Sequence, residues 1–223
     1  MRPRPTRQHL IDSLLDAYRA GAFPMADPDT GVLALYTAPQ RGVFPLTPGA
    51  FHVPRRLIQR LKTEPFAITT DTRFAQVVRS CAQPRGGDNG VWISEQLIDL
   101  YQLLHNAGHA HSVEAHSVDP DTGARSLVGG VFGIHLGGAF LGESMFHAPP
   151  PTGTDASKAC LVHLVAHLRR RGFTLFDTQM TNPFLEQFGN TEIPQDDYQS
   201  RLDIAVEMDI DWAPFEPHWP DAM

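Results

Sequence analysis

The chain has 223 residues, of which 42% are hydrophobic, and this is enough for a sizeable core in one large domain or two smaller ones. The composition excludes disordered, collagen-like and disulfide-scaffold proteins. Cys81 and Cys160 each lie in a predicted helix beside apolar neighbours, which favours reduced thiols in a cytoplasmic protein. No apolar run is long enough to cross a bilayer, so we expect a soluble protein without a membrane partner.

The net charge of −7 is unevenly distributed along the chain. Residues 1–62 carry nine Arg and Lys against four Asp, a net charge of +5 that leaves −12 for the rest. Such an asymmetry indicates a basic face for an anion and an acidic face for a cation. Chance clustering on a solvated surface is the alternative interpretation.

The first 62 residues predict a small, basic α+β lobe. Apolar spacing predicts a helix over residues 8–20 that ends at Gly21, followed by short strands at 32–36 and 42–44. A helix at 54–62 turns its cations outward, either as an ordinary amphipathic surface or as a ridge that contacts phosphates. The four cations expected to contact phosphates are Arg55, Arg56, Arg60 and Lys62.

Residues 63–223 predict a longer alternation of helices and strands. The expected strands are 66–70, 110–118, 127–136, 139–146 and 174–179, and the expected helices are 72–82, 94–106, 156–171 and a short one after Asn182. This order predicts an α/β (α+β mixed sheet) fold with helices on both faces, and a hairpin that feeds a helix and a parallel return strand is typical of acetyltransferases. We therefore expect a GNAT-like, acetyltransferase-like domain at 63–223 behind the lobe at 1–62.

Polar residues in apolar strands are the candidates for chemistry. Asp177 and Gln179 are two apart in a predicted strand, so their side chains are expected on one face. Glu143 lies in the second strand of the hairpin, and the three converge if these strands are neighbours. A carboxylate there can accept a proton from an attacking amine while the amide orients it. A satisfied structural hydrogen-bond network remains an open alternative.

The sequence gives only weak support for a metal site or a catalytic nucleophile. The pairs His109/His111 and His163/His167 lack partners for a four-ligand metal set, so we expect no metal. Ser144 lacks the glycine of a nucleophile elbow. Cys160 lies near a buried helix face, where a thiolate is disfavoured. We expect no covalent intermediate and no cofactor.

Several blocks, in order, give a more specific signal. Residues 17–24 resemble the A-Y-R-x-G-x-F-P signature of leucyl/phenylalanyl-tRNA–protein transferases. Further similar blocks lie at residues 91–93 (VWI), 108–114 (GHAHSVE), 127–130 (LVGG), 142–146 (GESMF) with 156–158 (ASK), 177–179 (DTQ), and 192–194 (EIP) with Tyr198. The resemblance covers residues 10–202.

The resemblance implies transfer of Leu, Phe or Met from aminoacyl-tRNA to the N-terminal Arg or Lys of a protein, which marks that protein for degradation under the N-end rule. It also implies an acetyltransferase-like domain that uses no acyl-CoA, and we expect a monomer. By position, Asp177 and Gln179 would relay the proton of the attacking amine. The residues implied to position or bind the substrates are Glu143, Asn182, Trp92, Met145 and Phe146.

Two departures concern substrate affinity. Residues 35–41 (LYTAPQR) stand where the family shows W-W-S-P-x-x-R, so Tyr36 would stack on a base there. Gln195 and Asp196 replace positive charge after Pro194. Two alternatives stay open: an acyltransferase with an acyl-CoA donor or an N-terminal Asp or Glu acceptor, and a tRNA-binding relative that has lost turnover.

Overall fold

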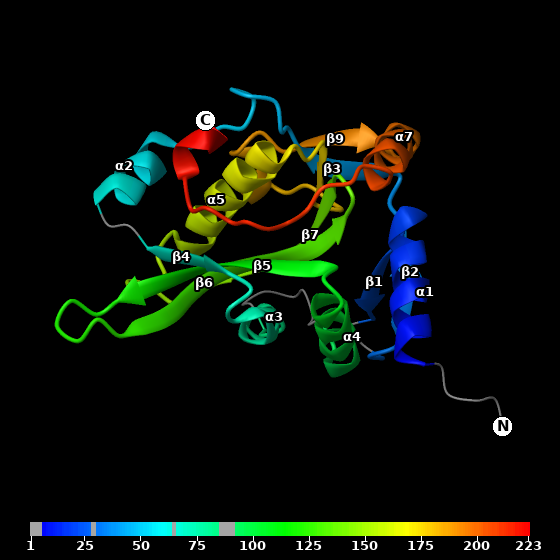
Figure 1. The fold of residues 1–223 in the computed structure, drawn as a ribbon, viewed down its shortest axis with the longest axis horizontal. Helices are drawn as coiled ribbons and strands as arrows, with labels where there is room; N and C mark the ends of the chain where they lie inside the picture. Colours follow the sequence, from blue (N-terminus) through cyan, green and yellow to red (C-terminus); the bar gives the residue numbers. More distant parts are fainter. Residues whose placement is uncertain (1–5, 28–29, 64–65, 85–91) are drawn as a thin grey trace.

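A computed structural model of the chain describes residues 6–27, 30–63, 66–84 and 92–223 (Figure 1). Of the predicted loop at 84–90, only Pro84 lies within these ranges; the rest of the loop and Val91 lie outside them. The predicted helices form within about two residues of their expected bounds. In the first of them, α1 (Arg7–Arg19), the Thr6 side chain caps the N-terminus by accepting from His9 N–H, and Gly21 follows with φ +74°.

The centre of the fold is a mixed sheet of seven strands. Adjacent strands in this sheet are antiparallel, except that β7 and β8 run parallel to each other. In spatial order the strands are β4 (Ala67–Thr70), β5 (Ala110–Val118), β6 (Arg125–Leu136), β7 (Ala139–His147), β8 (Leu175–Asp177), β3 (Gln40–Phe44) and β9 (Thr191–Pro194). β1 (Phe23–Ala26) and β2 (Leu33–Tyr36) form a separate two-stranded sheet.

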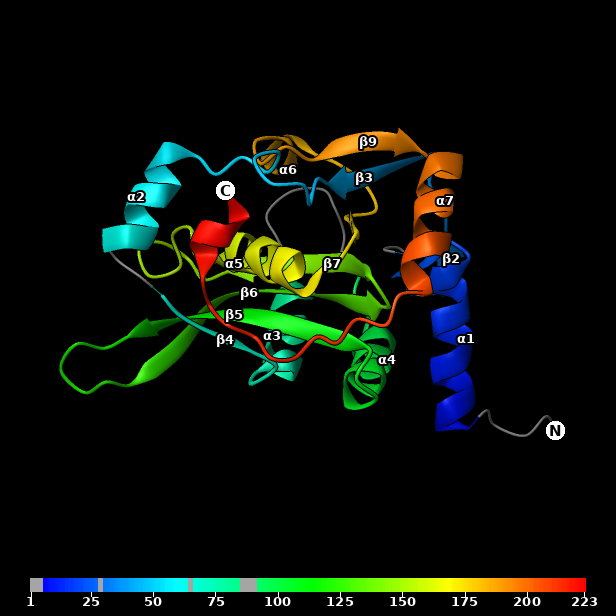
Figure 2. The same ribbon diagram turned by 45° about the horizontal axis from the view of Figure 1, so that its top comes forward.

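Helices cover both faces of the sheet, as predicted (Figures 1 and 2). On one face α3 (Phe74–Cys81) and α4 (Glu95–Asn106) pack with α1 in one apolar cluster. On the other, α5 (Ala156–Arg171) packs with α2 (Arg55–Thr63) in a second cluster, which also takes in the chain end near η1 (Trp219–Ala222). α6 (Pro183–Glu186) and α7 (Gln195–Val206) complete the helices of the described ranges.

Two expectations about strands were wrong in placement. The strand predicted at 42–44 does not pair within an N-terminal sheet, because β3 lies between β8 and β9 of the large sheet. The strand predicted at 174–179 ends at Asp177, because the chain turns at Gln179 into the left-handed region, φ 56°. The division of the chain at residue 62 stays a prediction.

The parallel strand pair separates part-way along β7. Pairing runs from Ala139↔Leu175 to Leu141↔Asp177 and stops there. The second half of β7 therefore has no strand on its β8 side, and side chains from both segments face the space that results. Among the described helices, none has the length and apolar character needed to cross a membrane.

Candidate active site

A cavity of about 1430 Å³ occupies the place where β7 and β8 separate. Residues 142–149 of β7 and its loop form one part of the wall, and residues 178–185 after β8 form another. Phe23, Met25 and Trp92 contribute from the side of β1. The cavity is therefore built from segments far apart in sequence.

Glu143 is directed into this cavity by a β-bulge. Phe132 pairs with Ser144 and Gly133 pairs with Gly142, so Glu143 is the extra residue of β7 with no partner on β6. Gly133 permits the bulge, because a Cβ there would lie 2.3 Å from the carbonyl oxygen of Leu141. The side chain of Glu143 lines the cavity and is only 9% exposed.

Burial raises the pKa of Glu143 to about 7, against an ordinary value of 4.5. Two fully buried tyrosines oppose this shift: the Tyr18 hydroxyl donates to Oε1 at 2.7 Å, and the Tyr101 hydroxyl donates to Oε2 at 2.8 Å. Asp177 raises this pKa further and Arg41 lowers it. The carboxyl group thus changes charge near neutral pH, where an amine proton acceptor is most useful.

Asp177 is fully buried and is not part of the cavity wall. Arg41, equally buried, donates from Nη2 to Oδ2 at 2.5 Å and from Nε to Oδ1 at 3.3 Å. The Tyr198 hydroxyl lies 3.1 Å from Oδ2, and the Gln179 backbone N–H donates to Oδ1 at 2.9 Å. The structural network left open by the sequence therefore exists around this carboxylate.

Gln179 reaches the cavity from the turn that follows β8. Asp177 and Gln179 do not share a strand face as expected, because the left-handed turn rotates Gln179 away from the strand direction. The turn places its Nε2 3.5 Å from Oε1 of Glu143 and leaves the side chain lining the cavity. The three predicted residues are thus adjacent, but only Gln179 and Glu143 face the open space.

Four of the five expected substrate-binding residues line the cavity: Trp92, Met145, Phe146 and Asn182. Asn182 is also the N-cap of α6, with Oδ1 accepting from Leu185 N–H at 3.0 Å. Tyr36, at the end of β2, is not part of the wall. It packs instead against the apolar cluster on the α1 side of the sheet.

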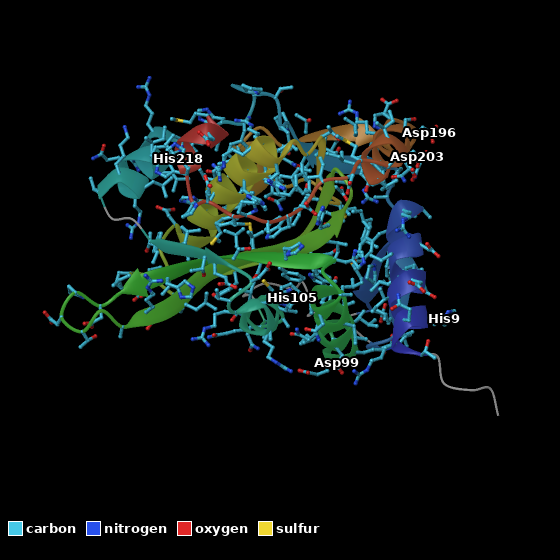
Figure 3. The ribbon with its side chains drawn as sticks, in the orientation of Figure 1. His9, Asp99, His105, Asp196, Asp203 and His218 are labelled. Atoms are coloured by element: carbon cyan, nitrogen blue, oxygen red, sulfur yellow. The ribbon has the colours of Figure 1, made fainter. Side chains whose placement is uncertain are left out.

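The four expected phosphate contacts lie on α2, outside the cavity wall. Arg55, Arg56 and Lys62 are exposed, and the guanidinium of Arg60 stands 6.0 Å from the Phe66 ring centroid. At the other end of the molecule α7 carries exposed carboxylates, among them Asp196 and Asp203 (Figure 3). The charge asymmetry of the sequence is therefore also a spatial one.

Four residues that donate hydrogen bonds to these carboxylates were not predicted from the sequence as part of the site: Arg41, Tyr18, Tyr101 and Tyr198. Tyr18 fits the apolar face of a helix, so spacing assigned it to packing. Arg41 was counted as one cation of the basic lobe and stands at the arginine of the family's W-W-S-P-x-x-R stretch, but no contact was predicted for it. Tyr18 and Tyr198 lie in blocks that carry the family resemblance, and only these blocks could have marked them as candidate site residues.

Fold and site together define a mixed α/β protein of the acyltransferase type, with a titratable carboxyl group where the parallel strands separate. A solved structure described as FemX has the same fold, with a TM-score of 0.54 and 11% identity over 84% of this chain and 67% of that one. This confirms the predicted fold class.

Residues 45–203 match a family model described as leucyl/phenylalanyl-tRNA protein transferase, and residues 10–39 match the model of its N-terminal domain. The chain belongs to the leucyl/phenylalanyl-tRNA–protein transferase family, and it is an aminoacyltransferase. The transferase of this name from Hyphomonas neptunium is 44% identical over 90% of this chain and 74% of its own length. The one from Gluconobacter oxydans is 44% identical over 90% and 84%. The predicted family and enzyme class are confirmed.

Proposed function

We propose that this chain moves Leu, Phe or Met from aminoacyl-tRNA to the N-terminal Arg or Lys of an acceptor protein and so marks it for degradation. The observation that carries the proposal is Glu143, a carboxyl group with a pKa of about 7 at the wall of a large cavity. An α-amino group has a pKa of about 7.7–8.0, so the two groups exchange a proton with little cost.

In the proposed step the α-amine of the acceptor attacks the carbonyl carbon of the aminoacyl ester. A C–N bond forms, and the bond from that carbon to the ribose oxygen breaks. Glu143 accepts a proton from the amine and delivers it to the ribose oxygen as that oxygen leaves. As a carboxylate, Glu143 also attracts the cationic N-terminus before the reaction.

Gln179 and Asp177 act together in this scheme. The Gln179 amide lies beside Glu143 Oε1 and orients the amine between them. Asp177 accepts the Gln179 backbone N–H and so holds the turn that presents this amide. Its own carboxylate is paired with Arg41 and does not meet the substrate. Asp177 is therefore a positioning residue.

The apolar part of the wall suits the side chain of the transferred amino acid. Phe44, Val131, Leu161 and Phe176 supply aliphatic and aromatic surface there. An apolar pocket separates side chains that differ by one methylene by only about 1–3 kcal/mol, so limited selectivity among Leu, Phe and Met is expected. Trp92 and Phe146 offer rings for stacking on the terminal adenine, and Asn182 offers an amide at the rim.

The remaining assignments follow from charge and cysteine chemistry. α2 meets tRNA phosphates through Arg55, Arg56, Arg60 and Lys62, while the acidic surface favours cationic acceptors. Cys81 and Cys160 are buried and form no disulfide within the described residues, which suits a cytoplasmic enzyme. We assign it as a monomer that needs neither cofactor nor membrane.

The test is a transfer assay with purified protein, leucyl-tRNA and peptides that differ only in their first residue. Peptides beginning with Arg or Lys should gain the mass of one leucine, whereas peptides beginning with Asp, Glu or Ala should not. Gln179→Ala and Asp177→Asn should lower the rate, and exposed Gln187→Ala should leave it unchanged.

Other outcomes separate the alternatives. Acylation of the peptide by acetyl-CoA without tRNA would replace the proposed donor, and modification of Asp or Glu peptides would replace the proposed acceptor. Salt-dependent binding of tRNA with no transfer to any peptide would show a binding protein.

A further inference from the structure

The N-terminus of α5 is left without a cap. Asp155 occupies the N-cap position with φ 62° and makes no capping hydrogen bond; its carboxylate pairs instead with Lys158 Nζ at 2.7 Å. The N–H groups of Ala156 and Ala159 have backbone acceptors. Those of Ser157 and Lys158 have none in the part of the chain that the structure describes. A 16-residue helix therefore begins with free donors and the positive end of its dipole.

The Ser157 hydroxyl is an independent sign that something binds here. The residue is 4% exposed, lines the cavity and makes no hydrogen bond among the described residues. The hydroxyl group is accessible from the cavity, so a ligand oxygen bound there can serve as its hydrogen-bond partner. With the free N–H groups beside it, the ligand atom expected is an oxygen of an anion.

The start of α5 lies at a definite distance from the proposed chemistry. Gly129 of β6 admits the helix, because a Cβ there would lie 2.9 Å from Ser157 N. Gly129 pairs with His147, which follows Glu143 by four residues on β7. Four residues of strand span roughly 13 Å. A donor that contacts both places must therefore reach along this part of β7.

The charges near this helix end also suit an anion. The carboxylate of Asp155, which would repel a phosphate, is neutralised by Lys158. The basic helix α2 lies at the end of the molecule where α5 begins, in both views of the ribbon (Figures 1 and 2).

We propose that the N-terminus of α5, through the Ser157 hydroxyl and the N–H groups of Ser157 and Lys158, binds a phosphodiester at the 3′ end of aminoacyl-tRNA. This inference rests on the proposed function, because it names how that site holds its donor. The phosphate fixes the terminal nucleotide so that its aminoacyl ester lies beside Glu143. A fixed phosphate lowers the KM of the donor with little effect on kcat.

The kinetic test uses two minimal donors, leucyl-adenosine esterified on the ribose and the same molecule with a 5′-phosphate. The wild-type protein should show about a tenfold lower KM for the phosphorylated donor, since hydrogen bonds to charged groups are the stronger ones. Ser157→Ala should abolish most of this preference without changing the KM for the unphosphorylated donor, and Ser157→Thr should restore it. Exposed Ser200→Ala on α7 is the matched control.

A binding test needs no transfer and separates this proposal from the proposed function. Adenosine and adenosine 5′-monophosphate are titrated into wild-type protein and Ser157→Ala, with tryptophan fluorescence as the readout. Preference for the monophosphate that disappears in Ser157→Ala supports the subsite even where transfer fails. Equal binding of the two compounds by the wild type overturns it even where transfer succeeds. Stronger, Ser157-dependent binding of coenzyme A would assign the site to a pyrophosphate instead and also overturn it.

Discussion

Two opposing influences set the pKa of Glu143 and therefore its charge at a given pH. Burial disfavours the carboxylate, while the hydroxyl groups of Tyr18 and Tyr101 stabilise it. The pKa of about 7 that results lies where the group is half charged in a neutral solution. Asp177, in contrast, accepts four hydrogen bonds: two from the buried Arg41 guanidinium, one from the Gln179 backbone and one from the Tyr198 hydroxyl.

The first prediction concerns the pH dependence of transfer. In the proposed step the carboxylate form of Glu143 accepts the proton, so the rate should rise with pH through an inflection near 7. Glu143→Gln should lose at least about a hundredfold in rate, the usual contribution of a general base. The measurement is kcat/KM for a Lys-initiated peptide between pH 5.5 and 8.5.

Exposed Glu192→Gln is the control for that experiment and should keep the wild-type profile. If Glu143→Gln keeps the same inflection with only a small loss in rate, the titrating group is the acceptor amine, and Glu143 is not the base.

The second prediction concerns stability. The folded pKa of Glu143 lies above its ordinary value of 4.5, so its protonation favours the native state below pH 4.5, and this contribution is lost as pH rises through about 7. At pH 8 the buried carboxylate costs on the order of 3 kcal/mol. Glu143→Gln should therefore be more stable than wild type at pH 8 but not at pH 4.5.

Urea unfolding at the two pH values measures this difference directly. A variant that is less stable than wild type at pH 8 would show that the tyrosine hydrogen bonds outweigh the burial of the charge.

At the scale of elements, α5 and the C-terminal segment (residues 207–223) hold each other in place. The last turn of α5 carries three arginines that donate to backbone carbonyls of this segment: Arg169 to Ala222, Arg170 to His218 and Arg171 to Asp211. Cations at a helix C-terminus are also favoured by its dipole. The long side chains thus fasten an irregular segment that has no strand or α-helix of its own.

Trp212 is the apolar anchor of that segment. Its ring stacks on His111 with centroids 4.4 Å apart and meets His167 of α5 at 4.5 Å. Burial lowers the pKa of His167 to about 3, so the imidazole stays neutral beside the indole at neutral pH. The Trp212 Nε1 donates to Thr70 Oγ1 at 3.1 Å, which joins the segment to β4.

The third prediction follows from this packing. Trp212→Ala should destabilise the protein by about 3–5 kcal/mol, the usual cost of removing a buried aromatic side chain. For a chain of this size the melting temperature should fall by roughly 10 °C. Trp212→Phe keeps a ring and loses the hydrogen bond, so it should cost only about 1–2 kcal/mol. Equal destabilisation in both variants would contradict the assignment of stability to the ring contacts.

At the scale of the whole molecule, exposed charges of opposite sign are separated. The exposed cations of α2 and the exposed carboxylates of α7 lie at opposite ends of the fold (Figures 1 and 3). The proposed donor is a polyanion and the proposed acceptor is a cation, so the two would meet surfaces of opposite sign. Such fields steer association over distances of about a Debye length, near 10 Å at 0.1 M salt.

The fourth prediction tests the basic end. The double variant Arg55→Ala, Arg56→Ala should weaken tRNA binding and reduce the slope of log K against log salt by about 1 for each phosphate that is no longer neutralised. Its kcat with a minimal donor should not change, because α2 lies outside the cavity wall. Arg201→Ala on α7 should leave the slope unchanged; an equal reduction there would indicate general attraction without a docking site.

Local sequence patterns predicted most of the elements and the family, although the helix α7 was not among the expected ones. Helix caps, positive-φ glycines and apolar spacing are local, so α1, α4 and the hairpin at Gly137 appear within about two residues of their predicted bounds. Several ordered motif blocks identified the family without any geometry. Spacing also brought Asp177, Gln179 and Glu143 forward as candidates, because polar residues in apolar strands need partners.

Which of these residues faces the cavity depends on the tertiary structure and not on local sequence. The insertion of β3 between β8 and β9 brings Arg41 against Asp177, over a sequence separation of 136 residues that no local pattern encodes. The bulge at Glu143 depends on the pairing register of β6 and β7. The left-handed turn at Gln179 is held by a local hydrogen bond from its backbone N–H to the Asp177 carboxylate, which the distant Arg41 fixes in place. Long-range packing therefore made Asp177 an anchor and left Glu143 in the cavity, because only burial and partners set the charge and direction of a carboxyl group.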